Sequence, residues 1–157
     1  MPALLIRPSR VEDLPAVTRI YAHLALHGTG TFELEAPDEP EMAQRREDVL
    51  AKGLPWLVAE RGGQVLGYAY ANHFRARRAY RFCLENSIYV DPAAQGQGVG
   101  RLLLAELLAQ CEARGARQML AAIEPALAAS PITASICRAP RASHWASNSA
   151  SNRRPTP

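Results

Sequence analysis

The sequence lacks any apolar run that approaches the roughly 20 residues needed to cross a bilayer. Its first ten residues, MPALLIRPSR, also lack the basic stretch and long apolar core of a signal peptide. Cysteine is scarce: Cys83, Cys111 and Cys137 are odd in number, and their spacing fits no metal-binding motif. We therefore expect a cytoplasmic protein in a reducing compartment, with no membrane partner and no metal.

Most of the chain carries no net charge. Residues 1–123 contain fourteen Lys or Arg and fourteen Asp or Glu, so the net charge of +3 comes from residues 124–157. A neutral folded part is poor evidence for nucleic-acid binding, and we expect no nucleic-acid partner. The length of 157 residues, with 48% apolar and 21% charged residues, is typical of one globular domain.

The last 34 residues lack glycine and apolar periodicity. Ala, Ser and Pro supply 19 of residues 124–157. Such a composition buries too little surface to offset the entropy lost on ordering. We therefore predict a folded unit over residues 1–123 and a poorly ordered tail over residues 124–157. A shift of reading frame near codon 124 is the explanation that we favour.

Local patterns predict alternating strands and helices. Gly62-Gly63 between two apolar runs is a strong hairpin signal. Ser9 and Glu12 match a capping box at the start of a helix. The predicted strands are 4–7, 56–60, 65–71, 83–90 and 118–123, with the last two side by side. The predicted helices follow Pro8, Asp38 and Gly100, and the third carries a leucine-rich apolar stripe.

A glycine-rich turn connects the strand ending at Val90 to the leucine-rich helix. Gly96, Gly98 and Gly100 stand at alternate positions there. Backbone N–H groups at a helix start, together with the helix dipole, favour a phosphate or pyrophosphate. The turn lacks the lysine of a P-loop and the glycine spacing of a dinucleotide fingerprint. A turn that binds no ligand is the alternative.

Two further features carry charge into this region. Residues 74–81 contain four arginines and two aromatics, which fits a solvated loop, a clamp for carboxylate or phosphinate groups, or an RNA contact. Glu85 is a carboxylate in an otherwise apolar strand that leads to the glycine turn. Such a group is costly unless it is paired or used. An ion pair with a nearby arginine and a role as general base both remain open.

Taken together, these residues resemble the GNAT superfamily of N-acetyltransferases, and more narrowly the phosphinothricin N-acetyltransferases. The resemblance covers about residues 3–123. It rests on Thr31-Phe32-Glu33, on residues 55–60, 67–71 and 74–81, on Glu85-x-Ser87, and on Gln95-Gly96-x-Gly98-x-Gly100.

The resemblance implies an α/β fold with a GNAT-type mixed, mostly antiparallel sheet flanked by helices. The family's C-terminal strands are missing from the pattern after residue 123. These strands normally complete the acceptor pocket and contribute to a homodimer. We therefore expect lower stability, weak or absent catalysis, a doubtful homodimer and retained acetyl-CoA affinity.

The resemblance also implies roles for single residues. Glu85, acting through water, would deprotonate the ammonium of a small-molecule amine. Phe32, Arg75 and Arg78 would define the acceptor pocket. Backbone groups would hold the co-substrate acetyl-CoA, its pantetheine arm at Ile88, Tyr89 and Val90 and its pyrophosphate at Gln95, Gly96, Gln97, Gly98, Val99, Gly100 and Arg101.

The implied activity is acetylation of an amino-acid analogue such as phosphinothricin, methionine sulfoximine or methionine sulfone. Two alternatives stay open. One is a remnant that binds acyl-CoA without catalysis, and the other is a nucleic-acid-binding module that uses the arginine segment and the tail.

Overall fold

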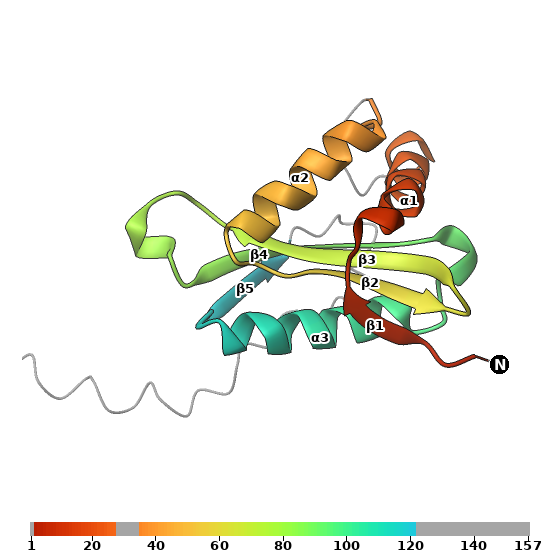
Figure 1. Ribbon diagram of the computed structural model, residues 1–157. Helices are drawn as coiled ribbons and strands as arrows, with labels where there is room; N and C mark the ends of the chain where they lie inside the picture. The colour runs from red at the N-terminus through yellow and green to blue at the C-terminus, as the bar shows by residue number, and fades with distance from the viewer. Residues whose placement is uncertain (1, 28–34, 122–157) are drawn as a thin grey trace, which may run out of the picture.

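The computed structural model describes residues 2–27 and 35–121, which form a sheet between two layers of helices (Figure 1). Helices α1 and α2 cover one face, and α3 covers the other. The helices are α1 (Leu14–His27), α2 (Glu39–Ala51) and α3 (Val99–Ala113). The strands are β1 (Leu5–Pro8), β2 (Trp56–Arg61), β3 (Gln64–His73), β4 (Cys83–Val90) and β5 (Gln118–Ala121).

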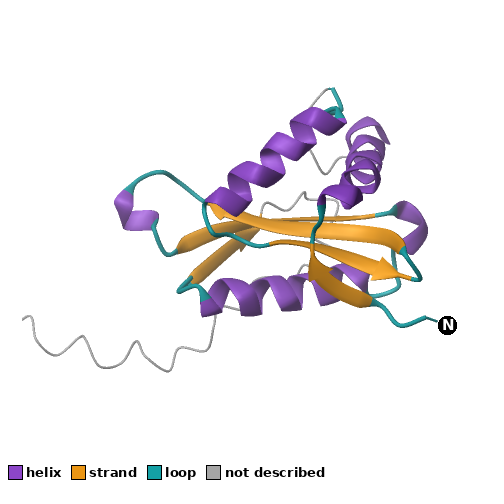
Figure 2. Cartoon of the chain, viewed as in Figure 1, coloured by secondary structure: helices purple, strands orange, loops and turns teal. Residues whose placement is uncertain are grey.

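The five strands lie in the order β1-β2-β3-β4-β5. The first three neighbouring pairs are antiparallel, and β4 and β5 are parallel. The expected mixed, mostly antiparallel sheet flanked by helices is therefore confirmed (Figure 2). The strand predicted beside β4 is present as β5, whereas its last residues, the 123/124 boundary and the tail lie outside the described residues.

The β2–β3 hairpin turns at its predicted glycine pair. Gly62 and Gly63 have φ of 58° and 82°. Two consecutive residues with positive φ make the tight turn whose twist matches that of the flanking strands. This hairpin places β3 in the centre of the sheet, where it positions β4 by antiparallel pairing from Gly67–Val90 to His73–Leu84.

The core has two layers, one on each face of the sheet. Alternation along a strand sends neighbouring side chains to opposite faces. Trp56 and Tyr68 are buried on the face of α1 and α2, together with Ile20 and Met42. Leu57 is buried on the opposite face, where Leu103 and Leu107 of α3 complete the second layer.

The predicted capping box at Ser9 and Glu12 is wrong by one residue. The backbone N–H of Arg10 donates to Asp13 Oδ2 at 2.7 Å, while Ser9 Oγ accepts from Arg46 Nε at 2.8 Å. Ser9 is buried, and its hydroxyl contacts Arg46 and does not cap the turn that begins at Val11. Asp13 also forms an ion pair of 2.8 Å with Arg7.

Candidate active site on β4

Strand β4 carries the predicted base at one end and leads to the glycine turn at the other. Glu85, Ser87 and Tyr89 alternate along the face toward α1, where the Tyr89 and Tyr21 rings lie 5.0 Å apart. Ile88 and Val90 alternate along the opposite face, toward α3. At about 3.3 Å per residue, the five steps from Glu85 to Val90 separate the two ends by roughly 17 Å.

Glu85 is half-buried and lies directly opposite Asn72 of β3. No ion pair joins it to Arg75, Arg77, Arg78 or Arg81 within the described part of the chain. The hypothesis that Glu85 forms an ion pair with a nearby arginine is therefore not supported. Its carboxylate remains available for chemistry on the face of the sheet covered by α1 and α2.

The arginine segment connects β3 to β4 and lies at the Glu85 end of the sheet (Figure 1). The guanidinium of Arg75 lies over the rings of Phe74 and Tyr80, at 5.0 and 5.7 Å from their centroids. Arg78 is exposed and begins a short 3-10 helix that ends at Tyr80. The two predicted acceptor-binding arginines are thus close to the Glu85 end, and Phe32 lies outside the described residues.

The glycine turn adopts a conformation that requires glycine. Gly96 and Gly98 have φ of 74° and 80°, which other residues reach only with strain. Gly98 is also the N-cap of α3, and no side chain caps the first turn. The first intrahelical bond runs from Leu102 N to Gly98 O. The N–H groups of residues 99–101 consequently have no acceptor within the helix.

N–H groups without an acceptor at a helix start favour an anion such as a phosphate or pyrophosphate. The first turn of α3 has no acidic side chain, so nothing opposes an anion at the positive end of the helix dipole. Gln95 and Gln97 are exposed in the turn before the helix, and Arg101 is exposed on its first turn. Val99 is instead buried, so its contribution is limited to the backbone.

The end of β4 next to the glycine turn has an edge to consider as well. The described pairing between β4 and β5 ends at Asn86 and Ala121. Asn86 is buried, and its Nδ2 donates to Leu120 O at 3.1 Å, which fastens the two strands at that point. From Ser87 to Val90, no described strand lies on this side of β4. Within the described residues, this part of the β4 edge therefore has no strand partner.

Cysteine chemistry fits the site poorly. Cys83 and Cys111 are both buried free thiols. Burial raises the pKa of Cys111 to about 11. The pKa of Cys83 is raised by burial and by the nearby Glu85 carboxylate. Because the thiolate is the nucleophile, neither side chain is suited to form an acyl-enzyme at neutral pH.

Sequence reasoning missed several residues near Glu85. An open pocket of about 190 Å³ lies on the same face of the sheet, between α2 and β3. Lys52 lines it from the end of α2, and Tyr70 and Asn72 line it from β3. Asn72 could not be placed opposite Glu85 from the sequence, because nine residues separate β3 from β4 and leave their register open.

No helix among the described residues is long and apolar enough to span a bilayer. No group of three or more His, Cys, Asp or Glu side chains in that part of the chain is arranged to hold a metal ion.

Comparison with known proteins places this arrangement in a family. Residues 18–130 match the Acetyltransferase (GNAT) family. A phosphinothricin N-acetyltransferase of Alcaligenes faecalis is 56% identical over 119 residues, which are 76% of this chain and 60% of that protein. An L-methionine sulfoximine/L-methionine sulfone acetyltransferase of Salmonella typhimurium is 36% identical over 127 residues, 81% of this chain and 74% of that protein.

A solved structure agrees with the fold. The crystal structure of a GNAT superfamily phosphinothricin acetyltransferase from Sinorhizobium meliloti in complex with acetyl-CoA matches with a TM-score of 0.76 and 45% identity. The match covers 78% of this chain and 67% of that one. The chain spans about three fifths of the length of the Alcaligenes faecalis relative. On the sequence match and the fold together, the chain belongs to the GNAT family of acetyltransferases.

Proposed function

We propose that the chain is an acetyl-CoA-dependent N-acetyltransferase whose acceptor is a small amino-acid-like amine. Phosphinothricin, methionine sulfoximine and methionine sulfone are the leading acceptors, because relatives named for them are 56% and 36% identical to this chain. The observation that carries the proposal is the position of Glu85. This carboxylate has no ion-pair partner among the described residues and shares β4 with the strand edge that leads to the glycine turn.

Each end of β4 would have a separate role. Backbone groups of Ile88, Tyr89 and Val90 would hold the pantetheine arm. The pyrophosphate would bind at the start of α3 and in the turn before it, at Gln95, Gly96, Gln97, Gly98, Val99, Gly100 and Arg101. When bound, acetyl-CoA supplies the acetyl group as an activated thioester.

Glu85 would act as the general base, directly or through one water. An ammonium has no lone pair, so the acceptor must lose a proton to Glu85 before its nitrogen can attack. The nitrogen then forms a C–N bond to the acetyl carbon as the C–S bond breaks. The amine loses two protons in all, of which one ends on the sulfur of CoA and the other is released from Glu85 to solvent.

Phe32, Arg75 and Arg78 stay predictions as acceptor-binding residues. A homodimer and a cytoplasmic location also stay predictions. The arginine segment favours acidic groups on the acceptor, because guanidinium groups bind carboxylate and phosphinate oxygens in pairs.

Two measurements on the same purified 157-residue chain test the proposal. Calorimetric titration with acetyl-CoA should give saturable binding. Thiol release should then depend on phosphinothricin, L-methionine sulfoximine or L-methionine sulfone. Binding without thiol release would favour the alternative of a non-catalytic acyl-CoA-binding protein. Absence of acetyl-CoA binding at millimolar concentration would contradict the proposal, and salt-dependent RNA affinity would then favour the nucleic-acid alternative.

A further inference from the structure

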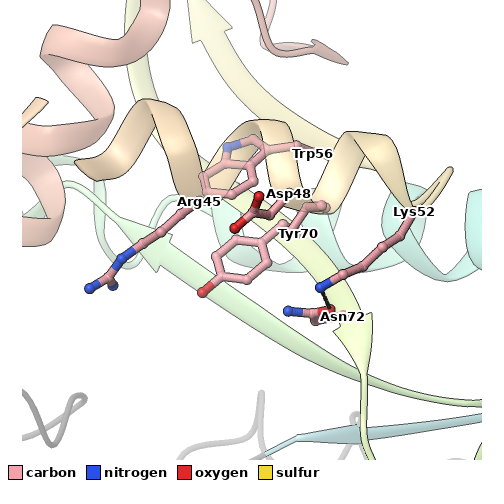
Figure 3. A pocket seen from close by; sticks show the side chains of 7 residues that line it. Arg45, Asp48, Lys52, Trp56, Tyr70 and Asn72 are labelled. Atoms are coloured by element: carbon pink, nitrogen blue, oxygen red, sulfur yellow. Dashed lines mark hydrogen bonds between the residues drawn. The ribbon is translucent and has the colours of Figure 1, made fainter. Parts of the chain in front are cut away.

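The pocket between α2 and β3 has no role in the proposed cofactor site. Its walls are mainly polar and come from α2, β2 and β3 (Figure 3). It is lined by Arg45, Asp48, Val49, Lys52, Trp56, Tyr70 and Asn72. Trp56 forms part of its apolar wall, and the Tyr70 ring stacks on the indole with centroids 4.3 Å apart.

The pocket adjoins the proposed base. Tyr70 and Asn72 pair with Ser87 and Glu85 of β4. Directly opposed side chains of an antiparallel pair share a face, with their Cβ atoms about 5 Å apart. The side chain of Asn72 therefore lies between the pocket and Glu85. A ligand in the pocket would have to pass along this one side chain to reach the Glu85 carboxylate.

Lys52 is the cation at this boundary. Its Nζ donates to Asn72 Oδ1 at 3.0 Å, drawn as the dashed line in Figure 3. The same oxygen accepts from the backbone N–H of His73 at 3.0 Å, so the Asn72 amide is held by two donors. An ammonium has three N–H donors, and two of those on Lys52 remain for another acceptor.

The other charged side chains of the pocket already have partners. Arg45 forms an ion pair with Glu41, one turn earlier on α2. Asp48 accepts a hydrogen bond from Gln44 Nε2 at 3.0 Å. Lys52, in contrast, forms no ion pair with any carboxylate in the part of the chain that the structure describes.

We propose that Lys52, oriented by Asn72, binds the α-carboxylate of the acceptor while the acceptor's amino group lies at Glu85. This inference rests on the proposed function and names a specificity residue for it. An α-amino acid that lies along the Asn72 side chain would present its carboxylate to Lys52 and its neighbouring ammonium toward Glu85. The site would then prefer amines that carry the acid, because only these gain a charge-assisted hydrogen bond to Lys52.

The test compares L-methionine sulfone with its α-carboxamide, which has the same side chain and amine but no negative charge. Lys52→Met keeps the length of the side chain and removes the cation. A charge-assisted hydrogen bond at an exposed site predicts a rise of about tenfold in KM for the acid, with kcat and the KM for the amide unchanged. Lys52→Arg keeps the positive charge, so its KM for the acid should be close to that of wild type.

Two further variants complete the design. Arg10→Met removes one positive charge from an exposed side chain beyond β1, and it should leave both KM values unchanged. Asn72→Asp supplies a carboxylate that pairs with Lys52, and it should weaken binding of the acid as Lys52→Met does. An acid-to-amide preference that is the same in wild type and Lys52→Met would overturn the inference.

The failure of this inference differs from that of the proposed function. If acetyl-CoA is turned over but Lys52→Met has no effect on the preference for the acid, only the role of Lys52 is wrong. If acetyl-CoA is neither bound nor turned over, the proposed function fails. Calorimetric binding of the acid and the amide to wild type and Lys52→Met then decides the role of Lys52 alone.

Discussion

The two ends of β4 are built from different parts of the chain. At the glycine end, one continuous stretch of sequence supplies the backbone N–H groups at the start of α3 and the part of the β4 edge that has no strand beside it among the described residues. At the Glu85 end, side chains from α2, β3 and β4 meet, brought together only by the fold. The comparison teaches that cofactor affinity and acceptor choice should respond separately to mutation.

The largest effect should come from the base. Glu85→Gln keeps the shape of the side chain and removes its ability to accept a proton at neutral pH. We expect kcat/KM to fall by about 10²- to 10⁴-fold, the usual contribution of general base catalysis. The Kd for acetyl-CoA, measured by calorimetry, should stay within about twofold of wild type, because the glycine end is untouched. Equal losses in kcat/KM and in acetyl-CoA affinity would show that the two ends of β4 do not act separately.

A change outside both ends should affect stability alone. Burial raises the pKa of Asp13, but its hydrogen bonds to Arg7 and to the Arg10 backbone lower it more, so the net pKa is below the ordinary value. Asp13→Asn should lower the free energy of unfolding by about 2 kcal/mol at pH 7. A carboxyl whose pKa is depressed in the folded state stabilises the fold at pH values above its unfolded pKa. This stabilisation is lost as the pH falls below the unfolded pKa and through the lower folded pKa.

Urea unfolding from pH 7 down to pH 3 measures this effect. The difference in unfolding free energy between wild type and Asp13→Asn should begin to close as the pH drops below about 4, the ordinary aspartate pKa. At urea concentrations well below the unfolding midpoint, the Kd of the variant for acetyl-CoA should equal that of wild type. A difference in stability that persists unchanged at pH 3 would contradict the role of the Asp13 charge.

The glycine end has its own variant. Gly98→Ala places a side chain at a φ of 80° with no atom within 4 Å of the new Cβ, so the cost is backbone strain of about 1 kcal/mol. Relief of that strain would shift the N-cap of α3, and acetyl-CoA should bind about tenfold more weakly while the acid-to-amide preference is retained.

Gly115→Ala is the matched control for this variant. Gly115 follows the other end of α3, has a φ of 89° and also has no atom within 4 Å of an added Cβ. It should lower stability by a similar amount and leave acetyl-CoA binding unchanged. If both variants weakened acetyl-CoA binding equally, the effect would reflect general destabilisation. The proposal that backbone groups at the start of α3 bind acetyl-CoA would then be wrong.

The smallest effect concerns how the glycine turn is held. Arg61 Nη1 donates to Gln97 Oε1 at 2.9 Å, and Gln97 Nε2 donates to Ala93 O at 3.0 Å. Contacts between exposed side chains contribute little to stability. Arg61→Ala should therefore raise the Kd for acetyl-CoA by about twofold or less. Arg61→Ala and Gln97→Ala should not add in the double variant, because both remove the same contact. Additive losses in calorimetric titrations would show that Arg61 acts on acetyl-CoA by another route.

The sequence predicted the elements that depend on neighbours along the chain. The hairpin at Gly62-Gly63 follows from backbone preferences of a few residues, and the structure confirms it. The leucine-rich helix predicted after Gly100 is also present, but α3 begins earlier, at Val99, so that Gly100 lies in its first turn. The capping box failed because Arg46, from a distant helix, binds Ser9. Lys52 was missed for the same reason: its contact with Asn72, the residue opposite Glu85, depends on packing α2 over β3 and on the β3–β4 register.

The stacked rings at the acceptor end also provide an optical signal. Trp56 is buried, its indole nitrogen lacks a hydrogen-bond partner within the described residues, and its ring lies against Tyr70 in the wall of the pocket. The sequence has one other tryptophan, Trp145, so Trp145→Phe would leave Trp56 as the sole indole emitter. Occupancy of the pocket could then be followed by fluorescence in real time, without a label and without turnover.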